Sequence, residues 1–229
     1  MIQTTGQETE IINDATIDTA QQQTLNLIDL FLAGGWIMWV LLAMSIYAVY
    51  LFFERSAALR AALKEDKNFM NKIKDYIHSG NLENARNLCE QTDNPVARLV
   101  EKGISRIGRP LNDIQTAVEN AGNIEVANLE KGLANLASIS GGGPMIGFLG
   151  TVTGMIEAFF QMASAGNNIE VSSLAGGIYT ALVTTVGGLI VGIIAYFAYN
   201  YLVSQVDRVV ATLETRTMEF MDLLNDPTA

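Results

Sequence analysis

Residues 140–158 read SGGGPMIGFLGTVTGMIEA, an apolar stretch that contains six glycines. A glycine inside a helix lowers stability by about 1 kcal/mol relative to alanine, so this density of glycine requires a structural reason. Gly143, Gly147 and Thr151 follow one another at four-residue spacing and would share one side of a helix. A stripe of small residues lets membrane helices approach closely. The stretch therefore predicts tight helix packing, either alone or together with a polar path that includes Thr151.

Three apolar blocks are each long enough to cross a bilayer, which takes about 20 residues. They occupy residues 25–54, 134–163 and 171–201, and no charged residue occurs from Val171 to Val206. The rest of the chain shows helical spacing of apolar residues and no β pattern. We therefore predict an all-α membrane protein with three transmembrane helices, long cytoplasmic helix extensions and a small cytoplasmic helical bundle.

The basic residues indicate the orientation of these spans. All 14 Lys and Arg residues lie between positions 55 and 131 or beyond position 207. Positively charged segments beside a membrane span remain cytoplasmic. The expected segments are an outer tail (1–24), transmembrane helix 1 (25–54), a cytoplasmic helical region (55–133), transmembrane helix 2 (134–163), an outer loop (164–170), transmembrane helix 3 (171–201) and a cytoplasmic C-terminal helix (202–229).

Two of these helices are expected to extend far beyond the membrane. From Leu111 the apolar spacing continues into the second span with no strong breaker before Gly141, which predicts one long helix. The third span is expected to continue to about Leu224. The short helices of residues 55–133 are too few to form an enzyme domain with its own pocket, so we expect no enzymatic activity.

The composition argues against several other functions. The net charge is −10 and the basic residues are interspersed with acidic ones, so we expect no nucleic-acid partner. The single cysteine, Cys89, excludes an intrachain disulfide framework, and with His78 it offers too few ligands for a metal site. Because His78 is the only histidine and is expected outside the membrane, an intramembrane protease is disfavoured.

Hydroxyl groups recur at mid-depth in the second and third spans. Thr151 lies 20 residues after Lys131, and Thr185 lies 22 residues before Asp207. At 1.5 Å per residue, both are roughly 30 Å from these flanking charges, so the two hydroxyls could share one level in antiparallel helices. The alternative is structural, because a threonine hydroxyl often bonds a carbonyl of its own helix.

No carboxylate or basic group is expected deep in the spans. Glu157 lies six residues beyond Thr151, about 9 Å further along a helix, and would be either an interfacial glutamate or part of an outer mouth. A proton path through a membrane normally needs a titratable group. If this protein moves ions, the carboxylate must therefore come from another chain.

At these residues the chain resembles the MotA/TolQ/ExbB proton-channel family. Residues 31–35 (FLAGG) with Glu54-Arg55 resemble the first span of that family. Residues 147–154 (GFLGTVTG) resemble the signature of the second span, and residues 177–189 followed by Tyr199-Asn200 resemble the third. Three spans instead of four place the chain nearer the TolQ/ExbB branch than the flagellar stators.

The resemblance implies a subunit of an ion channel and motor in the bacterial inner membrane, with residues 1–24 and 164–170 periplasmic. It implies a pentamer around a dimer of a single-span ExbD/TolR-like partner, which supplies the membrane aspartate. Ion flow would drive a TonB- or TolA-like protein, and thereby TonB-dependent outer-membrane transport. Thr151 and Thr185 correspond to the pore threonines of the family.

The chain departs from the family pattern at two positions. Thr180 stands where TolQ and ExbB usually carry a glutamate, and Thr184 stands where proton-type members often have alanine. Hydroxyls at Thr151, Thr184 and Thr185 with one carboxylate could coordinate Na⁺, so the translocated ion is H⁺ or Na⁺, with no other cofactor. A Tol-type role in envelope maintenance, a motility motor and a non-conducting membrane scaffold remain alternatives.

The candidate site residues form three groups. The ion-pathway residues are Thr151, Thr184, Thr185 and Thr180; the glycines for helix packing or pore lining are Gly143, Gly147, Gly150, Gly154, Gly177, Gly188 and Gly192; and Glu157 is the candidate for an outer mouth.

Overall fold

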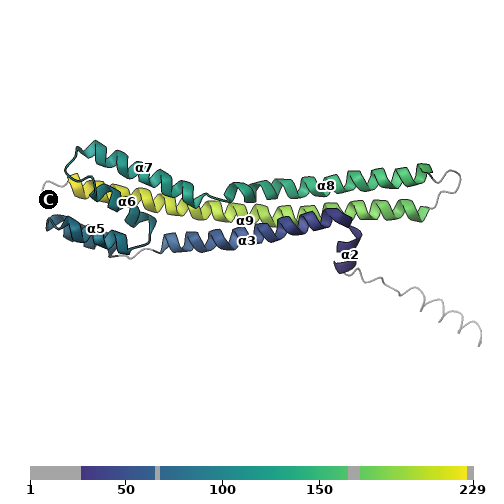
Figure 1. Cartoon of the computed structure of the whole chain (residues 1–229), viewed down its shortest axis with the longest axis horizontal. Coiled ribbons are helices and arrows are strands. Elements are labelled where there is room, and N and C mark those ends of the chain that lie inside the picture. The colour runs from purple at the N-terminus through teal and green to yellow at the C-terminus, as the bar shows by residue number, and fades with distance from the viewer. Residues whose placement is uncertain (1–26, 65–67, 165–170, 226–229) are drawn as a thin grey trace, which may run out of the picture.

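A computed structural model describes residues 27–64, 68–164 and 171–225, and within these ranges every regular element is an α-helix. The expected tail (1–24) and most of the expected outer loop (164–170) lie outside the described residues. The helices form an elongated rod: α3 and α8 lie along one half, shorter helices lie at the other end, and α9 runs through both (Figure 1). The helices are α2 (Leu27–Ala33), α3 (Gly35–Leu63), α4 (Phe69–His78), α5 (Leu82–Gln91), α6 (Pro95–Ile104), α7 (Leu111–Leu129), α8 (Leu133–Ser164) and α9 (Val171–Asn225).

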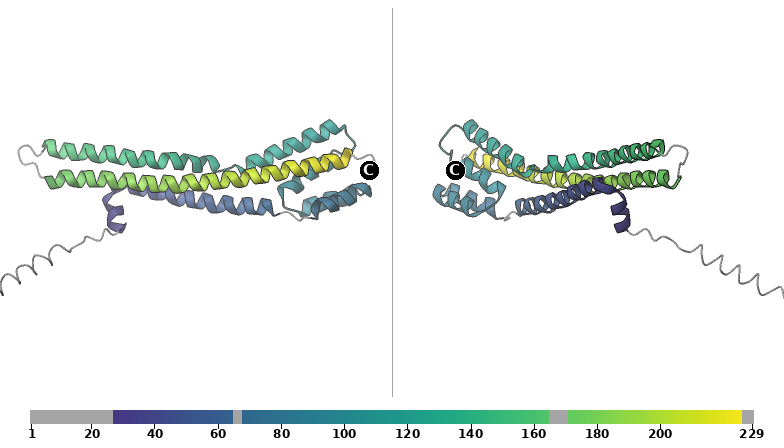
Figure 2. Two further views of the ribbon diagram at one scale, coloured as in Figure 1. Left: turned by 180° about the vertical axis from the view of Figure 1, so that it is seen from behind. Right: turned by 45° about the vertical axis from the view of Figure 1, so that its right-hand side comes forward.

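Helix α9 is the central element of the molecule. Its 55 residues span about 80 Å, and it lies between α8 and α3 in each of the views (Figures 1 and 2). Beyond position 201, where the third apolar block ends, the buried α9 residues Val209, Leu213 and Phe220 pack against the short helices. One helix therefore connects the two halves of the rod, as the apolar spacing to about Leu224 predicts.

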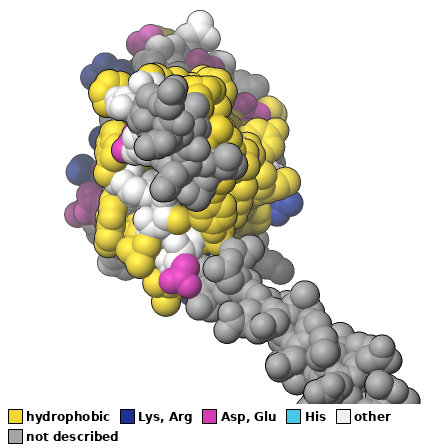
Figure 3. All heavy atoms as spheres, turned by 90° about the vertical axis from the view of Figure 1, so that its right-hand side faces the viewer, with side chains coloured by type: hydrophobic (Ala, Val, Ile, Leu, Met, Phe, Trp, Pro, Cys, Tyr) yellow, Lys and Arg dark blue, Asp and Glu magenta, His cyan; other side chains and the backbone are white. Residues whose placement is uncertain are grey.

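Three helical segments of the described chain are long and apolar enough to cross a membrane. They are Gly35–Leu63, Leu111–Ser164, which includes α7 and α8, and Leu174–Asn225. Their large apolar side chains point outward, and hydrophobic side chains cover both flanks of the end view (Figure 3). Such a surface requires a lipid or protein environment. The predicted class, an all-α membrane protein with three spans, is confirmed.

The first span begins with a bend that the spacing of its apolar residues does not reveal. The chain turns at Gly35, whose φ of +64° is in the left-handed region that glycine adopts without strain. Helix α2 therefore projects away from α3 (Figure 1). At its other end α3 continues past Glu54 and Arg55 to Leu63.

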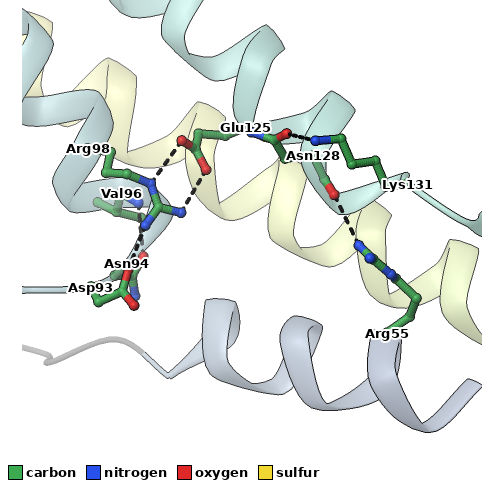
Figure 4. A network of polar contacts seen from close by, with 8 residues as sticks. All are labelled: Arg55, Asp93, Asn94, Val96, Arg98, Glu125, Asn128 and Lys131. Atoms are coloured by element: carbon green, nitrogen blue, oxygen red, sulfur yellow. Dashed lines mark hydrogen bonds and ion pairs between the residues drawn. The ribbon is translucent and has the colours of Figure 1, made fainter. Parts of the chain in front are cut away.

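The expected single helix from Leu111 through the second span is wrong. It is interrupted between α7 and α8, where Gly132 has a φ of +80°. Arg55 Nη1 donates to the Asn128 carbonyl at 3.3 Å, which satisfies an otherwise open acceptor at the end of α7 (Figure 4). The break lets α7 leave the line of α8 and cover the extension of α9.

The short helices form a compact bundle around the end of α9. Arg98 on α6 donates to both Glu125 carboxylate oxygens, at 2.9 and 2.7 Å, and to Asp93 at 2.7 Å, so that α6 is fastened to α7 (Figure 4). Asn94 caps α6 by accepting from the Val96 N–H at 2.9 Å. The buried Phe220 ring occupies the space beside Gly103, where a Cβ atom would collide with it.

Candidate functional site

Small residues from α8 and α9 meet in a continuous seam at the centre of the membrane-length region. The buried small residues of α8 and the small residues that face them on α9 follow the same spacing of four, three, four and four residues. Because the helices are antiparallel, the residues form successive layers. The layers are Gly143 with Gly192, Gly147 with Gly188, Gly150 with Thr184, Gly154 with Ala181, and Ala158 with Gly177.

The backbones in this seam approach too closely to admit a side chain. A Cβ atom on Gly147 would lie 2.9 Å from the Thr184 carbonyl oxygen and 3.0 Å from the Gly188 Cα. A Cβ atom on Gly188 would lie 2.6 Å from the Gly143 carbonyl oxygen. All seven glycines that were candidates for helix packing or pore lining lie in this seam between α8 and α9.

Thr151 and Thr185 lie beside this seam at one level. Thr151 directly follows Gly150, and Thr185 directly follows Thr184, the residue opposite Gly150 in the same layer. Because α8 and α9 are antiparallel, Thr151 and Thr185 point to the same side of the helix pair. Thr185 Oγ1 donates to the Gly147 carbonyl at 3.3 Å, the same oxygen that accepts the Thr151 N–H in an α-helix. Both threonines are half-buried. The structure thus brings together the two residues that the spacing placed at one height.

The surface around Thr151 and Thr185 is apolar and open. Phe148, Leu182 and Leu189 lie on the same side and are 65%, 61% and 44% exposed. Helix α3 packs on another side of α9. It contacts α9 at Gly187, which lies about 200° around the helix axis from Thr185. We call this surface, with Thr151 and Thr185 at its centre, the threonine face.

The neighbouring Thr184 does not belong to the threonine face. It is 1% exposed, and its Oγ1 donates to the Ala181 carbonyl of its own helix at 2.8 Å. The side chain fills the space left by Gly150, and its methyl group points toward Gly34 at the α2–α3 bend. Its hydroxyl is therefore enclosed where three helical segments meet.

Thr180 and Glu157 also lie apart from the two central threonines. Thr180 is half-buried and lies about 140° around α9 from Thr185, on the side of the seam where α3 packs. Glu157 is exposed on α8 beyond Thr151, toward the end that leads to residue 165. The four expected pathway threonines therefore separate into a facing pair and two residues with different surroundings.

The threonine face supplies hydroxyl groups but no charge. No charged residue occurs in α8 before Glu157 or in α9 before Asp207. Thr151 Oγ1 donates to the Phe148 carbonyl at 2.6 Å, which leaves its lone pairs available as acceptors. No cluster of three metal-ligating side chains occurs among the described residues. The face can hydrogen-bond a passing ion or a polar group, but it cannot itself bind and release a proton near neutral pH.

Two small residues in the seam were not among the expected site residues. Ala158 and Ala181 complete the layers at the end of the seam where α8 ends and α9 begins. The signal that identifies them is the spacing, because Ala158 lies four residues after Gly154 and Ala181 four residues after Gly177. The stripe is therefore longer than its glycines alone indicate.

Comparison with known proteins places these features in a family. Residues 91–215, more than half of the chain, match the family described as the MotA/TolQ/ExbB proton channel family. The chain is 27% identical over 188 residues to a biopolymer transport protein ExbB homolog of Methanothermobacter thermautotrophicus. The aligned residues cover 82% of this chain and 66% of that protein. The chain thus spans just under two thirds of the length of that relative.

Two other relatives represent the two kinds of protein in the TolQ/ExbB branch. The chain is 29% identical to the Tol-Pal system protein TolQ of Haemophilus influenzae over 88% of this chain and 94% of that protein. It is 28% identical to the biopolymer transport protein ExbB of Neisseria meningitidis over 71% of this chain and 79% of that protein. With three helices in its described part able to span a membrane, this chain belongs to the ExbB/TolQ branch of the MotA/TolQ/ExbB proton channel family.

Proposed function

We propose that the chain is the channel subunit of an ion-driven motor in the bacterial inner membrane, which powers TonB-dependent transport at the outer membrane. The observation that carries this proposal is the threonine face: two hydroxyls side by side on an open apolar surface without a charge of its own. A second protein that brings a membrane carboxylate would complete an ion path there. The N-terminus would be periplasmic and the C-terminus cytoplasmic.

The proposed partner is an ExbD/TolR-like protein with a single span. Several copies of this chain, five by analogy with the family, would surround a dimer of that partner. The exposed apolar side chains around Thr151 and Thr185 suit contact with a membrane helix, and the hydroxyls suit contact with its carboxylate. Ion transfer at the carboxylate would then move the partner against the ring, and a TonB-like protein would transmit the motion.

We propose protons as the ion that this motor uses. A sodium site of protein oxygens needs several ligands that converge on one point. The enclosed Thr184 hydroxyl removes one of the three side chains considered for such a site, which leaves two on the threonine face. Two hydroxyls beside a partner carboxylate suit a short hydrogen-bonded path for protons.

An ion-flux measurement tests this proposal. The chain and an ExbD/TolR-like partner are reconstituted together in vesicles, and proton entry is followed with an internal pH-sensitive dye under an imposed gradient. We expect Thr151→Val and Thr185→Val each to lower the partner-dependent flux by about tenfold or more, because valine removes the hydroxyl and keeps the side-chain shape. Flux that follows a sodium gradient instead would overturn the choice of ion.

Thr184→Val is the matched control in the same assay. It removes a neighbouring hydroxyl of the same helix, but that hydroxyl bonds only a carbonyl of its own helix. We expect it to leave the flux close to that of the unaltered protein. If all three variants conduct as well as the unaltered protein, the threonine face is not the ion path. If the assembly conducts nothing, the chain is a membrane scaffold and the motor proposal is wrong.

A further inference from the structure

A groove of about 370 Å³ runs between α3 and α9, away from the threonine face. Its walls are almost entirely apolar and include Ala48, Val49 and Phe52 from α3 with Ile194 and Ala198 from α9. Tyr201 lines the same groove and its ring lies 6.0 Å from that of Phe52. The groove is therefore an apolar slot on the outside of the membrane-length part of the molecule.

The length of the groove matches one leaflet of a bilayer. Its residues on α3 extend from Ser45 to Arg60, which is 15 residues or about 22 Å along the helix. A bilayer with its headgroups is about 40–45 Å thick, so one leaflet measures about 20–22 Å. The groove thus has the dimension of one lipid molecule that lies alongside the protein.

The charge in the groove lies at one end only. Arg60 is the only charged residue among the described residues that line it, and it lies at the end nearer the short helices. Arg60 is exposed and makes no ion pair with any residue in the described part of the chain. By contrast, the nearby Arg55 pairs with Glu54 at 2.7 Å. Because the first apolar block ends at position 54, Arg60 would lie near the lipid headgroups. There a guanidinium that pairs with none of the described carboxylates is complementary to a phosphate.

We propose that this groove binds one anionic phospholipid of the leaflet on the side of the short helices. The lipid phosphate pairs with Arg60, and an acyl chain lies along Phe52, Val49 and Ala48 toward Ser45. Tyr201 lies at the same depth as Phe52 and contacts the part of the lipid where the acyl chain joins the headgroup. The bound lipid fills the gap between α3 and α9 and so holds the outer helix against the central one.

The proposal does not depend on ion conduction. The groove and the threonine face lie on different sides of α9, because Ile194 and Ala198 follow the side on which α3 packs. Loss of the lipid site would leave the proposed path intact, and a failure of the flux measurement would leave the lipid site intact. The other possible occupant of an apolar groove is a helix of a second copy of this chain.

Retention of lipid by the purified chain tests the proposal. The full chain is incorporated into nanodiscs that contain equal amounts of phosphatidylglycerol and phosphatidylethanolamine, released into detergent, and analysed by native mass spectrometry. We expect about one phosphatidylglycerol per subunit to be retained in preference to phosphatidylethanolamine. Arg60→Gln should lower this retention by about five- to tenfold, whereas Arg60→Lys should keep most of it.

Arg208→Gln is the matched control. It removes an exposed arginine of α9 that lies beyond the third apolar block (171–201) and does not line the groove. We expect it to retain phosphatidylglycerol like the unaltered chain. Equal loss in Arg60→Gln and Arg208→Gln would mean that only general surface charge attracts the lipid, and no retained lipid in the unaltered chain would mean that the groove is not a lipid site. Either result overturns the proposal.

Discussion

Single glycines decide whether α8 and α9 can meet. Gly147→Ala adds a methyl group where the Thr184 carbonyl oxygen would be 2.9 Å away, so the two backbones must separate. We expect a loss of about 1–3 kcal/mol in the free energy of unfolding, measured by thermal or denaturant unfolding in detergent. Gly141→Ala is the control on the same helix, since nothing lies within 4 Å of its added Cβ. A Gly147→Ala protein as stable as Gly141→Ala would contradict the close packing.

The residue scale is also where the sequence is least informative. A four-residue spacing joins Thr180, Thr184 and Gly188 in one stripe. The structure instead uses a seam with one three-residue step, which brings Thr184 inside and leaves Thr180 on the side of α3. One residue corresponds to about 100° around a helix, so a small shift of the contact line changes which threonine is accessible. The height of Thr151 and Thr185 along their helices depends only on the number of residues from the flanking charges. In the structure the two residues lie at the same height.

Cys89 reports whether the bundle of short helices is closed. Burial raises the pKa of its thiol from 9.0 to about 12, and Glu101 and Glu90 add to the effect. The folded protein therefore keeps the thiol protonated between pH 9 and pH 12, where the unfolded chain loses the proton, so stability falls as the pH rises through this range. At pH 9 we expect iodoacetamide to modify Cys89 far more slowly in the folded protein than in denaturant. Equal rates would show that α5 is not docked.

At the scale of whole elements, glycine determines where helices end. The apolar spacing predicts the three membrane-length segments, because each is defined by many residues. It does not predict the bends at Gly35 and Gly132, since a glycine within an apolar or helical pattern is compatible with both a helix and a positive φ. At the break between α7 and α8, Arg55 of α3 contacts the Asn128 carbonyl, and this contact between residues far apart in the sequence is not contained in the apolar spacing.

The conformation of Gly132 leads to an ordered series of variants. Its φ of +80° is unfavourable for residues with a Cβ, whereas the added atom itself would make only ordinary contacts, with Leu51 at 3.4 Å and the Arg55 Nε at 3.7 Å. Gly132→Ala should therefore lower the free energy of unfolding by about 1 kcal/mol through backbone strain alone. Gly132→Asn should lose less, because asparagine tolerates this region better. The comparison uses thermal unfolding, and an alanine variant more stable than the asparagine variant would show that α7 and α8 straighten.

At the scale of the whole molecule, α9 divides two surfaces with different surroundings. On one side it packs with α3, and the groove there faces lipid in our proposal. On the other side the threonine face is open and apolar around two hydroxyls. A ring of such subunits would place the threonine faces inward and the α3 helices outward. In our proposal the chain provides one wall of an ion path, and a partner protein completes it.

Cross-linking between this wall and the partner measures that arrangement most directly. Thr185→Cys and, as a control, Ile190→Cys are made with Cys89→Ala and oxidised in membranes that also contain an ExbD/TolR-like partner with a cysteine beside its membrane carboxylate. Ile190 lies five residues further along α9, is 54% exposed and points about 140° away. We predict a cross-link to the partner at position 185 and none at position 190. A cross-link at position 190 with none at position 185 would show that the threonine face is turned away from the partner, and the account would be wrong.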